Sequence, residues 1–260
     1  MDLVPMPGGI VLDADIRITW DECIDALAGR DPESVQGRRR LASWLTICCL
    51  LARSSPATRA ERIRPLGLPV GHALHPGPGW GRRVLGGVLD LGLGVVGLDP
   101  AHPEDVTPLP PGIWTVLGVD PETYWPGVAD YLAAMASLAT ERRLRAPYDP
   151  LRPMGDCDVI TLLCHREYRT ALVGAAGAPG EMTAAGVPMR TRGWTQLRRI
   201  DPAFLVAAAA ATDEGQRGFA RPLLITADEV VMVSAGGRPG TIALLDAAPD
   251  PPWLRSVRYR

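Results

Sequence analysis

The spacing of apolar residues changes near residue 150, and this change constrains the fold more than any other feature of the chain. Before it, the longest apolar patterns have the period of an α-helix, whereas the last hundred residues hold short apolar runs between turn-forming segments. Such an order is typical of an α+β protein. The sequence predicts a mostly helical region over residues 1–150, packed on an α+β domain over 151–260 with a mixed or antiparallel sheet and two helices. The proline-rich segment 146–153 marks the division.

Aspartate followed by proline precedes three of the predicted helices. Aspartate accepts hydrogen bonds from the free amides at a helix start, and proline at the next position loses nothing by lacking its own. The helices are expected after Asp31, Asp120 and Asp201. The first is apolar nearly all round and includes Trp44, so we expect it to be central and buried. A capping-box match, TWDE at 19–22, predicts a further short helix.

The last hundred residues hold the predicted strands. CDVITLLC, residues 157–164, is apolar on both faces of an extended chain, which indicates a buried strand. REYRTALVGA predicts a helix, and VPMRTRGWTQL (187–197) a further strand. Short breaks between the next apolar runs favour antiparallel hairpins. These runs are RPLLIT (221–226), EVVMVS (229–234) and TIALLD (241–246).

Charge and hydropathy exclude several functional classes. The 27 basic residues, all arginine, nearly balance 29 acidic ones, so the net charge of −2 gives no field that would recruit nucleic acid or an acidic membrane. The beginning of the chain, MDLVPMPGG, lacks the basic and apolar regions of a secretory signal. The longest nearly uncharged apolar stretch, residues 84–98, falls short of the ~20 residues that span a bilayer. We therefore expect no membrane association.

Five cysteines are present, and none forms a C-x-x-C pair. An odd number without metal-ligand spacing argues against a disulfide framework and against a four-thiolate zinc site. A reducing cytoplasm is the expected compartment. The cysteines are Cys23, Cys48, Cys49, Cys157 and Cys164.

Two aspartates, Asp156 and Asp158, precede the apolar run in GDCDVITLLCHREYR and share one face of an extended chain. Carboxylates anchored on a buried strand can hold magnesium for phosphoryl or nucleotidyl transfer. In this respect the segment resembles the catalytic strand of the polymerase-beta-type nucleotidyltransferases, which implies a magnesium cofactor bound by both aspartates. The Gly-Ser signature that this family carries upstream is absent, since RAPYDPLRPM precedes the pair.

A metal site of this kind needs a third carboxylate, and the sequence leaves its identity open. A second D-x-D pair, Asp13 and Asp15 in IVLDADIRI, shows how easily the pattern arises by chance. The alternative explanation is that Asp156 and Asp158 are the solvated end of a strand. The candidates for the third carboxylate are Asp228, Glu229 and Asp246.

Two other motifs fail when their neighbours are considered. GLGVVG, residues 92–97, matches a dinucleotide fingerprint, but a proline-rich segment follows it where a helix is required. We expect a packed glycine-rich segment instead. His72 and His75 have a spacing that can bind a metal on a helix, but PGPG follows at once and no glutamate accompanies them. We expect histidines of a surface loop.

Cys164 and His165 are candidates for a nucleophile and its base. They could act together only if the chain turns at Cys164 into the following helix, because neighbouring side chains of a strand point apart. A thiol near a helix N-terminus has a lowered pKa. The apolar neighbours favour a buried structural cysteine instead.

Arginine and tryptophan gather in MRTRGWTQLRR, residues 189–199, which contains no acidic residue. Such a strip can receive phosphate, RNA or an acidic protein surface, with the tryptophan as an anchor. The negative overall charge favours a protein partner over nucleic acid. The alternative is a strip whose arginines pair with acids elsewhere in the fold. Its members are Arg190, Arg192, Trp194, Arg198 and Arg199.

Taken together, these patterns favour a non-catalytic accessory or partner-binding protein of a bacterial-type cytoplasm, which needs no cofactor and uses the arginine and tryptophan strip. One alternative is a metal-dependent phosphoryl or nucleotidyl transferase that binds magnesium through Asp156 and Asp158. The other is a cysteine-dependent enzyme that uses Cys164 and His165.

Overall fold

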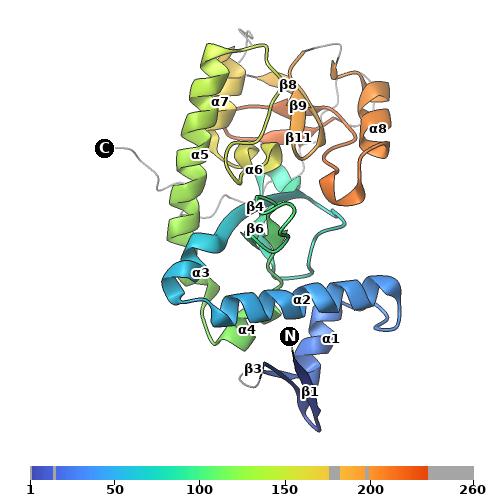
Figure 1. The fold of residues 1–260 in the computed structure, drawn as a ribbon. Helices are drawn as coiled ribbons and strands as arrows, with labels where there is room; N and C mark the ends of the chain where they lie inside the picture. Colours follow the sequence, from blue (N-terminus) through green and yellow to red (C-terminus); the bar gives the residue numbers. More distant parts are fainter. Residues whose placement is uncertain (1, 14–15, 176–181, 197–198, 234–260) are drawn as a thin grey trace. The chain divides into compact units, whose positions relative to one another are not determined.

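The computed structural model combines helices with three antiparallel sheets (Figure 1). It describes residues 2–13, 16–175, 182–196 and 199–233. The predicted mixture of helices and strands is confirmed. Contacts between residues divide the chain into two compact units. Unit 1 comprises residues 1–64, 76–80 and 93–127, and unit 2 comprises residues 65–75, 81–92 and 128–260.

Unit 1 contains a three-stranded antiparallel meander and a small group of helices. The strands pair in the order β1-β2-β3, and α1 packs on α2 and on α4. Buried side chains of the meander include Ile10, Leu12 and Ile18. The elements are β1 (Leu3–Met6), β2 (Gly9–Leu12), β3 (Ile16–Thr19), α1 (Trp20–Leu27), α2 (Val35–Arg53), α3 (Pro56–Arg62), β7 (Thr107–Pro108), α4 (Gly112–Leu117) and the 3-10 turn η2 (Pro121–Thr123).

Side-chain caps fix the starts of α1 and α2. The Thr19 hydroxyl accepts a hydrogen bond from the Glu22 amide, and the Glu22 carboxylate accepts one from the Thr19 amide at 2.8 Å. The predicted capping box is therefore confirmed. Helix α2, predicted after Asp31, begins after Ser34, whose hydroxyl accepts from the Gly37 amide. Trp44 is 1% exposed on this helix, as its apolar pattern predicts.

The second sheet has the strand order β4-β6-β5, and β7 pairs with the far end of β6. Every residue of β6 is buried. The GLGVVG motif therefore belongs to a packed strand and its continuation, as expected, and the next helix along the chain is α4. The elements are β4 (Ile63–Pro69), β5 (Gly81–Val84), the 3-10 turn η1 (Leu85–Gly87) and β6 (Leu89–Val95).

Unit 2 is built around an antiparallel sheet of order β11-β10-β8-β9. Helix α8 packs on β8 and α7 contacts β10, with α5 and α7 on the opposite side of the sheet from α8 (Figure 1). The three helices lie where the sequence predicts them, whereas TIALLD lies outside the described residues. The elements are α5 (Trp125–Arg145), α6 (Val159–Leu163), α7 (Arg166–Ala175), β8 (Thr183–Met189), β9 (Arg192–Trp194), α8 (Pro202–Ala210), the 3-10 turn η4 (Glu214–Gln216), β10 (Leu223–Ile225) and β11 (Val230–Met232).

Strands occur throughout the chain, so the prediction of a mostly helical first part followed by a sheet is wrong in its arrangement. The early strands are mostly four residues long, and their signal is weaker than that of α2. In β2 and β3, the buried Ile10, Leu12 and Ile18 alternate with more exposed neighbours. This period of two is the pattern of a strand with one buried face.

Residues 157–164 are buried, as predicted, but the prediction of a strand there is wrong. Val159–Leu163 form the short helix α6, because the Asp158 carboxylate accepts a hydrogen bond from the Thr161 amide at 2.7 Å and caps the helix. An apolar run with no polar face suits a buried helix as well as a buried strand. The Thr161 hydroxyl also accepts from the Gly67 amide of β4 at 2.9 Å, which joins α6 to the second sheet.

Candidate functional site

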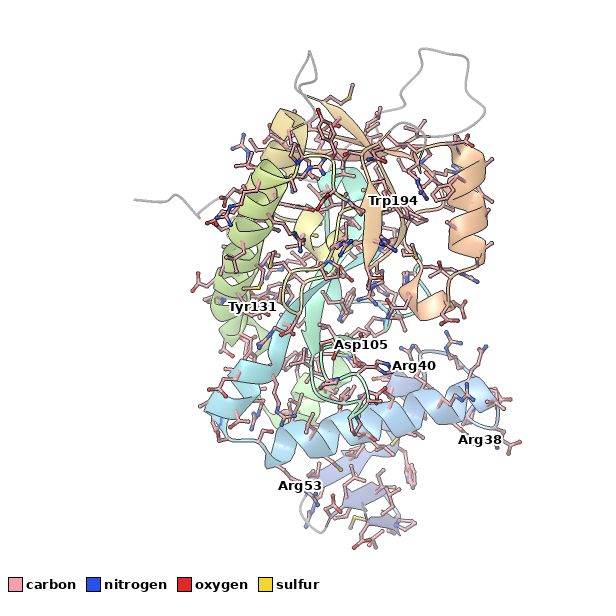
Figure 2. The ribbon with its side chains drawn as sticks, turned by 45° about the horizontal axis from the view of Figure 1, so that its top comes forward. Arg38, Arg40, Arg53, Asp105, Tyr131 and Trp194 are labelled. Atoms are coloured by element: carbon pink, nitrogen blue, oxygen red, sulfur yellow. The ribbon has the colours of Figure 1, made fainter. Side chains whose placement is uncertain are left out.

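Four side chains of unit 2 form what we call the arginine–tryptophan surface: Arg192, Trp194, Arg199 and Phe204. Arg192 and Trp194 lie two residues apart on β9, so they share one face of the strand. The guanidinium carbons of Arg192 and Arg199 lie 6.0 and 5.6 Å from the centre of the Trp194 ring. Phe204 of α8 meets the same ring edge-on at 5.6 Å. Figure 2 shows Trp194 on the sheet of strand order β11-β10-β8-β9.

The two arginines of this surface are exposed, while Trp194 and Phe204 are half-buried. A guanidinium group within about 6 Å of an aromatic ring is attracted to the face of that ring. Within the part of the chain that the structure describes, no carboxylate forms an ion pair with Arg192 or Arg199. The surface therefore presents two positive charges that lie against the half-buried ring of Trp194.

Arg190 does not belong to this surface, because it pairs with an acid inside the fold, as the alternative explanation of the strip predicts. Only 6% of Arg190 is exposed, and its Nε donates to the Asp158 carboxylate at 2.7 Å. Its Nη1 donates to the Gly215 carbonyl at 3.1 Å. Residue 190 lies in the turn between β8 and β9, where the alternation of strand faces no longer applies. Arg198 lies outside the described residues.

Asp156 and Asp158 bind different groups of the described part of the chain. The Asp158 carboxylate binds Arg190 and the first turn of α6, whereas the Asp156 carboxylate accepts a hydrogen bond from the Tyr131 hydroxyl of α5 at 3.0 Å. Asp228, a candidate third ligand, pairs with Arg166 at 3.0 Å. Among the described residues, no group of three or more His, Cys, Asp or Glu side chains is placed to hold a metal ion. The described geometry thus lends the magnesium alternative no support.

The chain does turn at Cys164, which ends α6 one residue before His165, and α7 follows. The cysteine alternative required this turn. The Cys164 thiol is 2% exposed and donates to the Ile160 carbonyl within its own helix. Burial, with a smaller effect of Arg169, lowers the pKa of His165 to about 4, so the ring is neutral at pH 7. These contacts direct the thiol into the core and favour a structural role.

The cysteines provide a direct test of that conclusion. All five are buried, and burial raises the pKa of the Cys23, Cys48 and Cys49 thiols. We therefore expect that iodoacetamide at neutral pH modifies none of them in the native protein and all of them after denaturation in urea. Mass spectrometry of both samples gives the result. Rapid modification of native Cys164 would instead favour a cysteine-dependent enzyme.

His72 and His75 lie in a loop, as expected, but both are half-buried and hold that loop in place. The Nε2 atom of His72 lies 3.0 Å from the Arg217 carbonyl oxygen, and that of His75 lies 3.5 Å from the Asp90 carboxylate. Asp90, which is 5% exposed, also accepts a hydrogen bond from Arg83 at 3.3 Å. The two histidines thus contact different partners in this loop.

Sequence reasoning placed Arg192, Trp194 and Arg199 in one segment but missed Phe204. The ring of Phe204 reaches Trp194 because α8 packs on β8, and no local pattern signals such a contact. Its one visible signal is its place in the first turn of the helix predicted after Asp201, close in sequence to the strip.

Comparisons with known proteins do not assign the chain to a family. No family model matches it, and no curated protein or solved structure matches it either. Of the helices that the structure describes, none has the length and apolar character needed to cross a membrane. Function therefore has to be argued from the residues of the chain itself.

Proposed function

We propose that this is a partner-binding protein whose arginine–tryptophan surface recognises an acidic segment of a second protein. One observation carries the proposal: two exposed guanidinium groups stack on the half-buried Trp194, and no carboxylate of the described residues pairs with either. Tryptophan and arginine are the residue types that contribute most to binding at protein interfaces. Two arginines that lie against one tryptophan ring are therefore suited to such a role.

Carboxylates are the ligands that this surface fits best. The planar guanidinium group binds a carboxylate through two parallel hydrogen bonds, and two of them within reach of one ring suit closely spaced acidic side chains. Because Arg192 and Arg199 already lie against Trp194, less side-chain freedom is lost when a partner binds. A short peptide rich in aspartate or glutamate is therefore the expected ligand.

Nucleic acid fits the same charges less well. Binding to a phosphate backbone depends on a basic field that extends over many contacts, and its strength grows with the number of phosphates neutralised. The whole chain carries a net charge of −2, and the surface contributes only two exposed arginines. The proposal therefore commits to an acidic protein segment.

Charge reversal tests the proposal. The Arg192→Glu/Arg199→Glu variant should lose at least about tenfold in affinity for a fluorescent polyglutamate peptide, because like charges would meet across the interface. Fluorescence anisotropy measures this affinity, with a single-stranded RNA as the second probe. Stability should fall by no more than about 3 kcal/mol, since the variant removes three cation–π contacts and an exposed one contributes about 0.5–1 kcal/mol.

The matched control is Arg38→Glu/Arg39→Glu, which changes the net charge equally at two exposed positions of α2. This variant should keep the affinity of the wild type for the peptide. The proposal fails if the wild type does not bind the peptide, if both variants lose binding to the same extent, or if RNA binds more tightly than the peptide.

A further inference from the structure

A cavity of about 190 Å³ lies within unit 2 at the C-terminal end of α5. Its walls come from the last turns of this helix, from the loop over residues 149–152, and from Tyr168 of α7. The cavity is lined by apolar residues, including Ala139 and Leu151, and by the polar residues Arg142, Arg143, Asp149, Arg152 and Tyr168. Three arginines and one aspartate give this lining a net positive charge.

Arg142 and Arg143 of this helix donate hydrogen bonds only to neutral oxygen atoms. Arg142 donates to the carbonyl groups of Arg152 and Pro153, at 2.6 and 3.0 Å. Arg143 donates to the Asp149 carbonyl at 3.0 Å and to the Thr195 hydroxyl at 2.5 Å. In the described segments of the chain, neither guanidinium forms an ion pair with a carboxylate. The Asp149 carboxylate also acts on Arg143, but without an ion pair, so the three arginines that line the cavity keep a net positive charge.

Arg143 carries the strongest indication of a missing ligand. It is 5% exposed, and its buried Nε has no hydrogen-bond partner among the described residues. A buried charge is costly unless it is paired and hydrogen-bonded. The carbonyl groups at the end of a helix attract cations, which explains arginines at this place in general, such as the exposed Arg145. They do not explain why the Nε atom of the buried Arg143 lacks a hydrogen-bond partner.

Tyr168 adds a neutral donor to the same cavity. It is 2% exposed, and burial raises its pKa to about 12, against a smaller opposing effect of the two arginines. The phenol therefore keeps its proton at neutral pH and can donate a hydrogen bond. Two guanidinium groups with a phenol form a set of donors suited to an oxyanion.

We propose that this cavity binds a phosphate-type oxyanion, either inorganic phosphate or the phosphate group of a small molecule. Arginine pairs provide the bidentate geometry that phosphate oxygens prefer, and the volume suits a small ligand rather than a nucleotide chain. The bound anion neutralises Arg142 and Arg143 and accepts a hydrogen bond from Tyr168. The inference does not depend on the arginine–tryptophan surface, because it uses other residues and another ligand.

Isothermal titration calorimetry of the full chain tests the inference. Inorganic phosphate and glycerol phosphate are titrated in turn, with sodium chloride of equal ionic strength as the reference. Saturable binding of at least one phosphate compound is expected, and the stronger of the two identifies the source of the anion. Tyr168→Phe removes one hydroxyl and retains the ring, so it should weaken binding about tenfold while the fold stays intact.

Arg142→Gln should weaken binding at least as much, and Arg145→Gln serves as the matched control. Arg145 lies on the same helix end, is exposed and pairs with Glu141 at 3.1 Å, so its loss should leave the affinity unchanged. If Arg142→Gln does not fold, Tyr168→Phe alone decides. The inference is overturned if neither phosphate compound shows saturable binding, or if Tyr168→Phe binds as tightly as the wild type.

Discussion

Replacing Arg190 with alanine is expected to lower the free energy of unfolding by about 3–5 kcal/mol. The side chains of Arg190 and Asp158 are 7% and 10% exposed, and they meet at 2.7 Å. Without the guanidinium group, the Asp158 carboxylate stays buried at the start of α6 with only the hydrogen bond from the Thr161 amide. A buried charge that has lost its partner accounts for the size of the effect.

Urea denaturation of the wild type and the variants measures this change. Arg192→Ala is the matched control, because it removes an exposed arginine only two residues away and should cost about 1 kcal/mol or less. The double variant Arg190→Met/Asp158→Asn removes both charges and keeps a residue that can cap α6. It should be more stable than Arg190→Ala. A loss below about 1 kcal/mol for Arg190→Ala would show that the pair is solvated.

Trp44→Ala is expected to lower the free energy of unfolding by about 3–5 kcal/mol, the range for deleting a large buried aromatic side chain. Trp44 is 1% exposed on α2 and is among the largest fully buried side chains of the described residues. Its indole Nε1 has no hydrogen-bond partner there, so the contribution of this residue comes from its packed volume. The cavity left behind produces the loss.

Two controls separate volume from chemistry at this position. Trp44→Phe removes the indole N–H and keeps an aromatic ring, so it should cost clearly less than Trp44→Ala. Ser43→Ala, at the exposed neighbouring position, should leave stability within about 0.5 kcal/mol of the wild type. Urea denaturation monitored by circular dichroism gives all three values. An equal loss for Trp44→Phe and Trp44→Ala would contradict the packing argument.

The helices were predictable because their signals are local. In α1, the side chains of Thr19 and Glu22 each accept a hydrogen bond from the backbone amide of the other residue. The start of this helix is therefore determined by four consecutive residues. In α2, apolar residues at helical spacing predict both the helix and its burial. The strands of the first hundred residues were missed because most of them are only four residues long and because a partner strand supplies much of the stability of each.

The candidate sites show the same limit. The arginine–tryptophan surface could be predicted in part, because Arg192 and Trp194 lie two residues apart on one strand and therefore share a face of it. The burial of Arg190 could not, since it depends on a turn and on Asp158, which is 32 residues away in sequence. For α6, the capping pair of Asp158 and Thr161 was visible in the sequence, but the apolar run suggested a strand.

The close approach of β4 and α6 links two distant positions of the sequence. The Gly67 amide donates to the Thr161 hydroxyl across 94 residues of chain, and a Cβ atom at position 67 would lie 3.0 Å from the Thr161 Cα. A larger residue at 67 would push the two backbones apart, and a residue without a hydroxyl at 161 would leave a buried amide unpaired. Neither loss can be offset by a side-chain change at the other position, so we expect glycine at 67 and a hydroxyl-bearing residue at 161 to be retained together during divergence.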